Sequence, residues 1–241
     1  VILRGQFNYG ALGLPPGPGP VGEIDLDMKG HGWGYNLGLQ WRYSETLSLG
    51  LTCRSDVKVE YEGDVERKDS PVPPSHTASD AELDIRYPWS VAGGACWQAT
   101  PKLRLEFAAE WMQWSTWDEM VVQNQDGLLG PAYTMQRQWN DSWIIMLGAE
   151  YELNEKWTLR VGYSFNETPV PDSTVNVDLP TGDTHAIGLG AGYQYSDTLS
   201  FDAAINFAYG LERDINNGVA PANSEFEAIS TYISLGVNYQ F

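Results

Sequence analysis

The chain has 241 residues, and its 32 acidic side chains outnumber its 14 Lys and Arg, giving a formal net charge of −18 at pH 7. Nucleic acids are poor partners for such a chain, because binding to phosphates needs basic patches. Its mean hydropathy is −0.33, and no apolar run approaches the ~20 residues that a membrane-spanning helix needs. Composition therefore excludes a nucleic-acid-binding protein and a helical membrane protein.

Apolar and polar side chains alternate along most of the chain. The first such segment has Leu3, Phe7 and Tyr9 on one face. Nine longer segments follow the same pattern, at residues 33–43, 47–61, 83–91, 103–111, 143–153, 157–165, 187–195, 199–211 and 231–241. Because successive side chains of a strand point to opposite faces, this period predicts nine complete strands and a tenth at the start.

The connections between these segments alternate in length. Short turns are expected at residues 44–46, 99–102, 154–156 and 196–198, and long segments at 10–30, 63–80, 118–134, 167–183 and 213–225. Outer-membrane barrels have short periplasmic turns and long extracellular loops. The strands of a soluble β-sandwich show the same alternation, but its core does not require so long and aromatic a face on every strand. We therefore expect an all-β, antiparallel transmembrane barrel of the bacterial outer membrane, in one domain over residues 1–241.

The last strand ends on an aromatic residue, with Tyr239 and Phe241 on its apolar face. This ending is typical of the closing strand of an outer-membrane barrel, and we interpret Tyr239 and Phe241 as the signal for the barrel-assembly machinery. The same reasoning predicts a periplasmic C-terminus. Nothing in the sequence points to an oligomer, and we expect a monomer.

The two cysteines are expected to be free thiols. Cys53 falls on the lipid-facing side of its strand and Cys96 on the lumen side of the next strand. A disulfide requires Cβ atoms about 3.5–4.5 Å apart, which opposite faces prevent unless a bulge at Gly93-Gly94 inverts the alternation.

Soluble-enzyme motifs fail on their context. Residues 17–22 spell G-x-G-x-x-G, but prolines and the lack of a following helix exclude a dinucleotide turn. His31, His76 and His185 are scattered, with no nucleophile elbow and no zinc-binding H-E-x-x-H. We expect no enzyme activity, no catalytic or metal-binding residues and no cofactor.

The predicted lumen face mixes both signs of charge, and most of these side chains are expected to form a salt-bridged network that stiffens the wall. Arg54, Lys58 and Arg160 share this face and are the candidates for capturing an anionic headgroup by charge-assisted hydrogen bonds. Small apolar residues beside them suit an amphipathic ligand. The acidic loops are expected to be a solvated surface, with divalent ions or lipopolysaccharide as the alternative partner.

Several segments resemble the outer-membrane long-chain fatty acid transporter family (FadL-type). They are residues 6–12 (QFNYGAL), 32–38 (GWGYNLG), 54–63 (RSDVKVEYEG), 111–117 (WMQWSTW) and 160–171 (RVGYSFNETPVP). The resemblance implies a fourteen-stranded barrel with an N-terminal hatch, in which hydrophobic ligands pass through a lumen pocket and leave sideways through the wall. The hatch and roughly four strands have no counterpart here, so the chain resembles the C-terminal part. Cys53 and Thr184 also depart from the family pattern, and Thr184 stands where an Arg is often found.

Two interpretations of this shortfall stay open. The chain is either a fragment of a longer protein, which we favour because unpaired strand edges are prohibitive in lipid, or a reduced ten-stranded barrel. Val1 follows no signal peptide or initiator Met, as expected for a processed end or an internal start. The expected function is passive transport of hydrophobic small molecules, with long-chain fatty acids first and aromatic hydrocarbons second. The rival functions are a structural or adhesive barrel and a water-filled porin.

Overall fold

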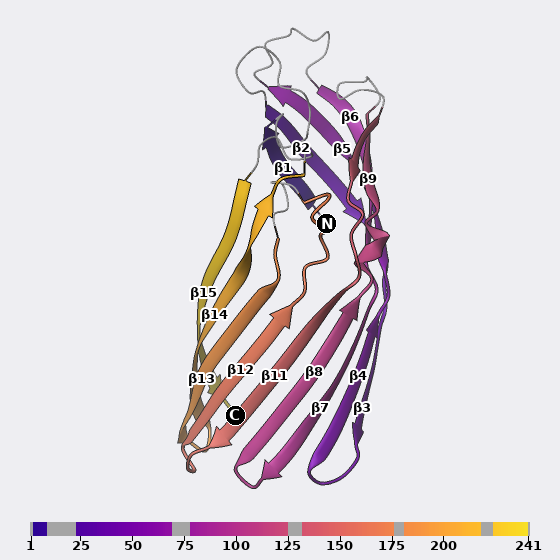
Figure 1. Ribbon diagram of the computed structural model, residues 1–241. Helices are drawn as coiled ribbons and strands as arrows, with labels where there is room; N and C mark the ends of the chain where they lie inside the picture. Colours follow the sequence, from indigo (N-terminus) through magenta and orange to yellow (C-terminus); the bar gives the residue numbers. More distant parts are fainter. Residues whose placement is uncertain are drawn as a thin grey trace.

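The computed structural model describes residues 2–8, 23–68, 78–124, 132–175, 181–217 and 224–240. Within these ranges the chain forms fifteen strands and one short 3-10 helix, η1 (Trp114–Thr116). The strands make two antiparallel sheets, one of nine strands and one of six (Figure 1). No helix in the described part of the chain is long and apolar enough to cross a membrane.

The nine-stranded sheet, called the wall below, has the strand order β15-β14-β13-β12-β11-β8-β7-β4-β3. In chain order its strands are β3 (Asn36–Arg42), β4 (Leu47–Arg54), β7 (Ser90–Thr100), β8 (Leu103–Met112), β11 (Ser142–Glu152), β12 (Trp157–Asn166), β13 (Thr184–Ser196), β14 (Leu199–Ile215) and β15 (Ser224–Tyr239). Seven of the nine predicted segments are strands of the wall, and the segments 47–61 and 83–91 contribute to it only in part. Short turns join the lower ends of the wall strands in Figure 1. The prediction of the seven strands is confirmed, whereas most of β7 lies beyond the segment predicted for it.

The six-stranded sheet was not predicted. Its order is β1-β2-β5-β6-β9-β10, formed by β1 (Ile2–Asn8), β2 (Glu23–His31), β5 (Val57–Lys68), β6 (Ala78–Tyr87), β9 (Glu119–Asn124) and β10 (Ala132–Gln136). Three of the segments expected to be loops therefore contain strands. The predicted tenth strand exists as β1, but it pairs with β2 in this sheet rather than in the wall, and Tyr9 lies outside the described residues.

Two predicted strands are each divided between the sheets. The segment 47–61 breaks at Ser55 and Asp56, and the segment 83–91 breaks at Pro88 and Trp89. At the first break the Ser55 and Tyr35 backbones are joined, because Ser55 N donates to Tyr35 O and Tyr35 N donates to Ser55 Oγ, both at 2.9 Å. Beyond the breaks, β5 and β6 pair with each other and leave the wall.

One face of the wall is apolar and exposed. Nearly all of its large exposed hydrophobic side chains occupy odd-numbered positions, as alternation predicts. Aromatic rings lie eight residues apart on four neighbouring strands, at Trp143 and Tyr151, Trp157 and Phe165, His185 and Tyr193, and Phe201 and Tyr209. Eight residues span about 26 Å along a strand. A strand tilted by about 40° would then place an apolar band of roughly 20 Å between two rows of rings, similar to the band of outer-membrane barrels.

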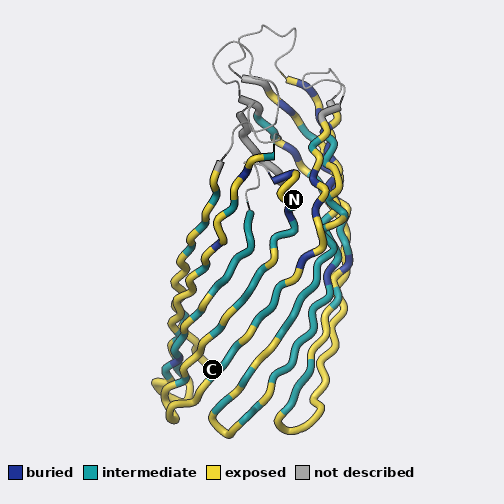
Figure 2. Tube along the Cα trace, viewed as in Figure 1, coloured by how far each residue is buried: buried dark blue, intermediate teal, exposed yellow. Residues whose placement is uncertain are grey.

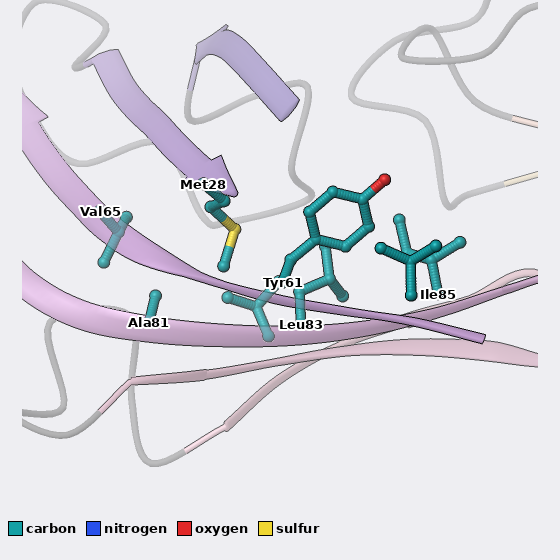
Figure 3. Close-up of a cluster of buried hydrophobic side chains, with 8 residues drawn as sticks. Met28, Tyr61, Val65, Ala81, Leu83 and Ile85 are labelled. Carbon is teal, nitrogen blue, oxygen red and sulfur yellow. The ribbon is translucent and has the colours of Figure 1, made fainter. Parts of the chain in front are cut away.

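The six-stranded sheet has a hydrophobic core of its own. Met28, Val59, Tyr61, Leu83 and Ile85 are at most 5% exposed and pack together on one face of the sheet (Figure 3). Figure 2 shows the difference as alternating buried and exposed positions in this sheet, against intermediate and exposed positions in the wall. The prediction that the apolar residues of 57–61 and 83–87 face lipid is therefore wrong, because these residues lie in the second sheet and are covered by protein.

Candidate functional site

Mostly even-numbered residues of the wall line a cavity of about 510 Å³. It extends over β8, β11, β12, β13, β14 and β15, and we call this side of the wall the cavity face. Three glycines lie in register across its middle, with Gly148 paired to Gly162 and Gly162 paired to Gly188. A second cavity of about 710 Å³ adjoins it through Glu106 and Gly148. Glycine in a strand often marks a close approach by a ligand or another backbone.

A chain of ion pairs, the charge belt, crosses the cavity face. Arg104 lies 3.1 Å from Glu106 and 3.3 Å from Glu150. Arg160 lies 2.6 Å from the other oxygen of Glu150 and 2.8 Å from Asp202, which also accepts a hydrogen bond from Asn238 Nδ2 at 2.8 Å. The expected salt-bridged network is thus present, with three carboxylates against two guanidinium groups.

Arg160 reaches Asp202 across an intervening strand. Arg160 is on β12 and Asp202 on β14, and β13 lies between them. The space is provided by Gly192, where an added Cβ would lie 3.0 Å from Asp202 Oδ1 and 3.3 Å from Arg160 Nη1. The glycines of β13 therefore shape the belt.

The structure does not bring the three predicted anion-binding cations together. Arg54, on β4, aligns through Ser90 and Met112 with Ser142 of β11, whereas Arg160 pairs with Glu150 of β11. Ser142 and Glu150 are eight residues apart, or about 26 Å along the strand. Arg54 and Arg160 therefore lie near opposite ends of the wall.

Lys58 lies in a different sheet from the other two cations. On the exposed face of β5, its Nζ is 2.8 Å from Glu60 and 2.9 Å from Asp84. Hydrogen bonds to Glu60 and then to Asp84 raise the pKa of Lys58 above its usual value. Its position was mispredicted because alternation indicates which face a residue occupies but not which sheet the strand joins.

The side chain of Arg54 is hydrogen-bonded to a neutral residue, Asn36. Its Nε donates to Asn36 Oδ1 at 3.3 Å, and among the described residues it forms no ion pair. Its side chain is exposed. Of the three predicted cations, Arg54 is thus the one whose charge is not already neutralised by carboxylates.

The remaining sequence-predicted residues are at the edges of the described structure. Tyr239 ends β15 with 59% of its surface exposed, and Phe241 lies outside the described residues. Both cysteines are free. Cys96 is on the cavity face, where its Sγ donates to Glu106 at 3.7 Å.

Trp114, Trp117 and Trp139 form an aromatic cluster at the end of the wall nearest the six-stranded sheet, and their packing was not predicted. Trp139 stacks on Trp117 with ring centroids 4.6 Å apart, and Trp114 meets both rings edge-on at 5.2 Å. Trp139 also packs against Val170 and Ile215. The closely spaced tryptophans at 111–117, together with Trp139 and Trp143, were the available signal, but their spacing does not show which rings pack together.

The family described as Outer membrane protein transport protein (OMPP1/FadL/TodX) matches residues 20–241 of this chain. The chain belongs to this family. It is 25% identical to the Long-chain fatty acid transport protein of Salmonella typhi, over 94% of this chain and 55% of that protein. With the protein of the same name from Escherichia coli K12 it shares 24% identity, over 89% of this chain and 50% of that protein. The chain spans about half the length of these curated relatives.

Solved structures give the same fold. A FadL homologue of Pseudomonas aeruginosa matches with a TM-score of 0.77 at 19% identity, covering 99% of this chain and 61% of that one. The Pseudomonas putida toluene transporter TodX matches with a TM-score of 0.59 at 20% identity, covering 92% and 53%. This member of the OMPP1/FadL/TodX family therefore has the all-β, antiparallel fold of a transmembrane barrel of the bacterial outer membrane.

Proposed function

We propose that the protein transports hydrophobic small molecules passively across the outer membrane, along the cavity face. The observation that carries this proposal is a cavity of about 510 Å³ on the inner side of a wall whose outer side is apolar. Small side chains and glycines leave room beside the wall for a ligand. Burial of the ligand would supply affinity of about 25 cal/mol for each Å² of apolar surface removed from water.

Long-chain fatty acids are the first candidate substrate, as the names of the curated relatives suggest. A fatty acid needs a cation for its carboxylate, and Arg54 supports this role best because only Asn36 engages its side chain. Arg160 is held between Glu150 and Asp202, and Lys58 between Glu60 and Asp84. We therefore retain Arg54 as the proposed headgroup contact and place Arg160 and Lys58 second.

Neutral aromatic hydrocarbons are the second candidate, and the charge belt favours them. Its three carboxylates exceed its two guanidinium groups, so the cavity beside them repels an anion and tolerates a neutral ring. The toluene transporter TodX shares this fold, although fold alone does not identify a substrate.

Uptake of labelled oleate and labelled toluene tests the proposal in cells that lack their own transporter and express the natural gene. Arg54→Ala should lower oleate uptake about tenfold, because a hydrogen bond to a charged group contributes about 1.5–3 kcal/mol, and should leave toluene uptake unchanged. Lys156→Ala, in the turn between β11 and β12, is the matched control for loss of a positive charge. If neither compound enters although the barrel is inserted, a structural or adhesive role replaces transport. Steady ion conductance through the purified protein would instead indicate a porin.

Orientation and assembly complete the proposal. We propose that the turns joining the wall strands, and the C-terminus, face the periplasm, and that Tyr239 and Phe241 direct insertion of a monomer by the barrel-assembly machinery. A cysteine introduced at Glu155, in the turn between β11 and β12, should then resist a membrane-impermeant thiol reagent in intact cells. Labelling of this cysteine from outside would reverse the orientation.

A further inference from the structure

A short segment, Thr168–Val175, lies across the end of the wall where β12 ends and β13 begins, and we call it the strap. One side is bonded to the segment that leads into β11. Asn140 N donates to Pro169 O at 2.8 Å, and Thr174 Oγ1 donates to the carbonyl of Arg137. The strap is therefore joined to the β11 side of the wall.

The other side of the strap is bonded to β14 and the residues after it. Arg213 donates to Val170 O at 2.6 Å and to Asp172 Oδ1 at 2.6 Å. Asn217 Nδ2 donates to Val175 O at 2.8 Å. In the wall, β12 and β13 separate β11 from β14, so the strap spans about three strand spacings, or roughly 14 Å (Figure 1).

A bulge in β14 makes this attachment possible. Gly210 pairs with Ala228 and Arg213 pairs with Phe226, so β14 has one more residue than β15 over this interval. An extra residue inverts the alternation beyond it. Arg213 and Ile215, at odd positions that would otherwise point to the apolar face, are thereby turned toward the cavity face and the strap.

Apolar packing holds the strap closed but leaves two polar atoms unpaired. Val170 and Val175 are buried against Trp139 and Ile215. Trp139 Nε1, in a side chain 8% exposed, and Ser142 Oγ, in one 1% exposed, have no hydrogen-bond partner in the described structure. An unpaired buried donor is destabilising, and Trp139 Nε1 would become accessible to a partner if Val170 and Val175 moved away from its ring. This unpaired donor lowers the cost of opening the strap.

We propose that the strap is a gate at one end of the cavity face, shown here closed, and that ligand passes when it separates from Trp139 and Ile215. This inference rests on the proposed transport function. The moving part is the eight-residue strap, and the release step breaks its hydrogen bonds with Arg213 and Asn217. The aromatic cluster stays with the β11 side and offers an apolar surface to the arriving ligand.

A reversible cross-link tests the gate. Asp172→Cys and Arg213→Cys would be combined in a Cys53→Ser, Cys96→Ser background of the natural gene, and treated with a short bis-methanethiosulfonate reagent. The untreated variant has lost the Arg213 contacts and should take up labelled oleate or toluene at least as fast as the parent. The cross-linked variant should lose uptake at least tenfold, and dithiothreitol should restore it.

A matched control separates gating from damage by the reagent. Glu119→Cys with Gln136→Cys joins two adjacent strands of one hairpin, whose side chains are 3.2 Å apart in the parent, and its cross-link should leave uptake unchanged. Undiminished uptake by the cross-linked Asp172/Arg213 variant would overturn the gate while leaving transport intact. Absence of uptake by the parent itself would instead overturn the proposed function, and the gate with it.

Discussion

Arg160 of β12 forms an ion pair with Asp202 of β14 at 2.8 Å, although β13 lies between the two strands. Salt bridges in a sheet usually join adjacent strands, where facing side chains are about 5 Å apart. Here the missing side chain of Gly192 allows the guanidinium group to extend one strand further. One glycine thus determines how far the charge belt reaches.

Gly192→Val should break this long-range pair. Its Cβ would lie only 3.0 Å from Asp202 Oδ1, so Arg160 or Asp202 must move. Both partners are more than a third exposed, so we expect a loss of only about 1 kcal/mol in the free energy of unfolding. Urea titration in lipid vesicles measures it. Gly50→Val is the control, since an added Cβ there meets nothing within 4 Å. An equal loss when Gly192→Val is made in an Arg160→Ala background would contradict the explanation.

The stability of the six-stranded sheet should decrease at high pH because of Tyr61. Burial, followed by its hydrogen bond to Tyr87, raises the pKa of Tyr61 from 10.0 to about 12. Between pH 10 and pH 12 the folded protein keeps a proton that the unfolded chain has released, so the free energy of unfolding falls as pH rises through this window. The full contribution is present below pH 10.

The size of this loss is on the order of 3 kcal/mol, since one unit of pKa corresponds to about 1.4 kcal/mol. Unfolding midpoints measured from pH 8 to pH 12 should show it. Tyr61→Phe lowers stability at every pH, because the hydrogen bond to Tyr87 is lost, but it should flatten the decline above pH 10. An unchanged slope in that variant would show that another group is responsible.

A charge at the middle of the apolar face should be costly. Ile205 lies midway between the rings of Phe201 and Tyr209 and is 43% exposed on that face. Ile205→Arg should destabilise the protein by about 2–4 kcal/mol, as expected for Arg at the bilayer midplane, when folding into vesicles is measured. Asn206→Arg, the next residue and on the cavity face, should cost much less. Equal costs would mean that this part of β14 does not face lipid.

An added methyl group at Gly30, near the end of β2, should destabilise the protein. A Cβ there would lie 2.7 Å from the backbone oxygen of Glu60 and 2.7 Å from a methyl group of Val59. We expect Gly30→Ala to cost about 1–3 kcal/mol through overpacking, seen as a smaller folded fraction at intermediate urea concentrations. Gly38→Ala, whose nearest atom would be 3.8 Å away, should fold like the parent.

The wall could be predicted from sequence because apolar and polar side chains alternate along each of its strands, and this alternation shows which residues share a face. Trp157 to Phe165 is a clear example, since every odd side chain is apolar and the whole segment is β12. Alternation does not reveal what covers an apolar face, so Tyr61 and Leu83 were assigned to lipid although protein buries them. A length signal was available, because the segment 47–61 exceeds the 9–11 residues that cross a bilayer.

The candidate site was only partly predictable for a related reason. The face on which Arg54 and Arg160 lie follows from the alternation along their strands. Their separation along the wall depends on the register between paired strands, which the sequence of a single strand does not reveal. Arg213 was out of reach because the bulge after Gly210 inverts the alternation, and no residue type at that point announces it. Contacts made by loops, such as that of Trp139 with Val170, have no periodic pattern in the sequence and could not be predicted from it.

The breaks at Ser55–Asp56 and Pro88–Trp89 have a consequence for where the protein rests in its bilayer. On one side of this boundary exposed residues such as Leu51 are apolar, and on the other side exposed residues such as Glu60, Glu62 and Asp84 are acidic. If the protein moved deeper into the bilayer by two residues of a strand, these carboxylates would enter hydrocarbon. If it moved outward by the same amount, aromatic side chains would lose their contact with lipid. We therefore expect the two breaks to lie at the membrane–water interface and to fix the depth of the protein in the bilayer, whatever the loops beyond them bind.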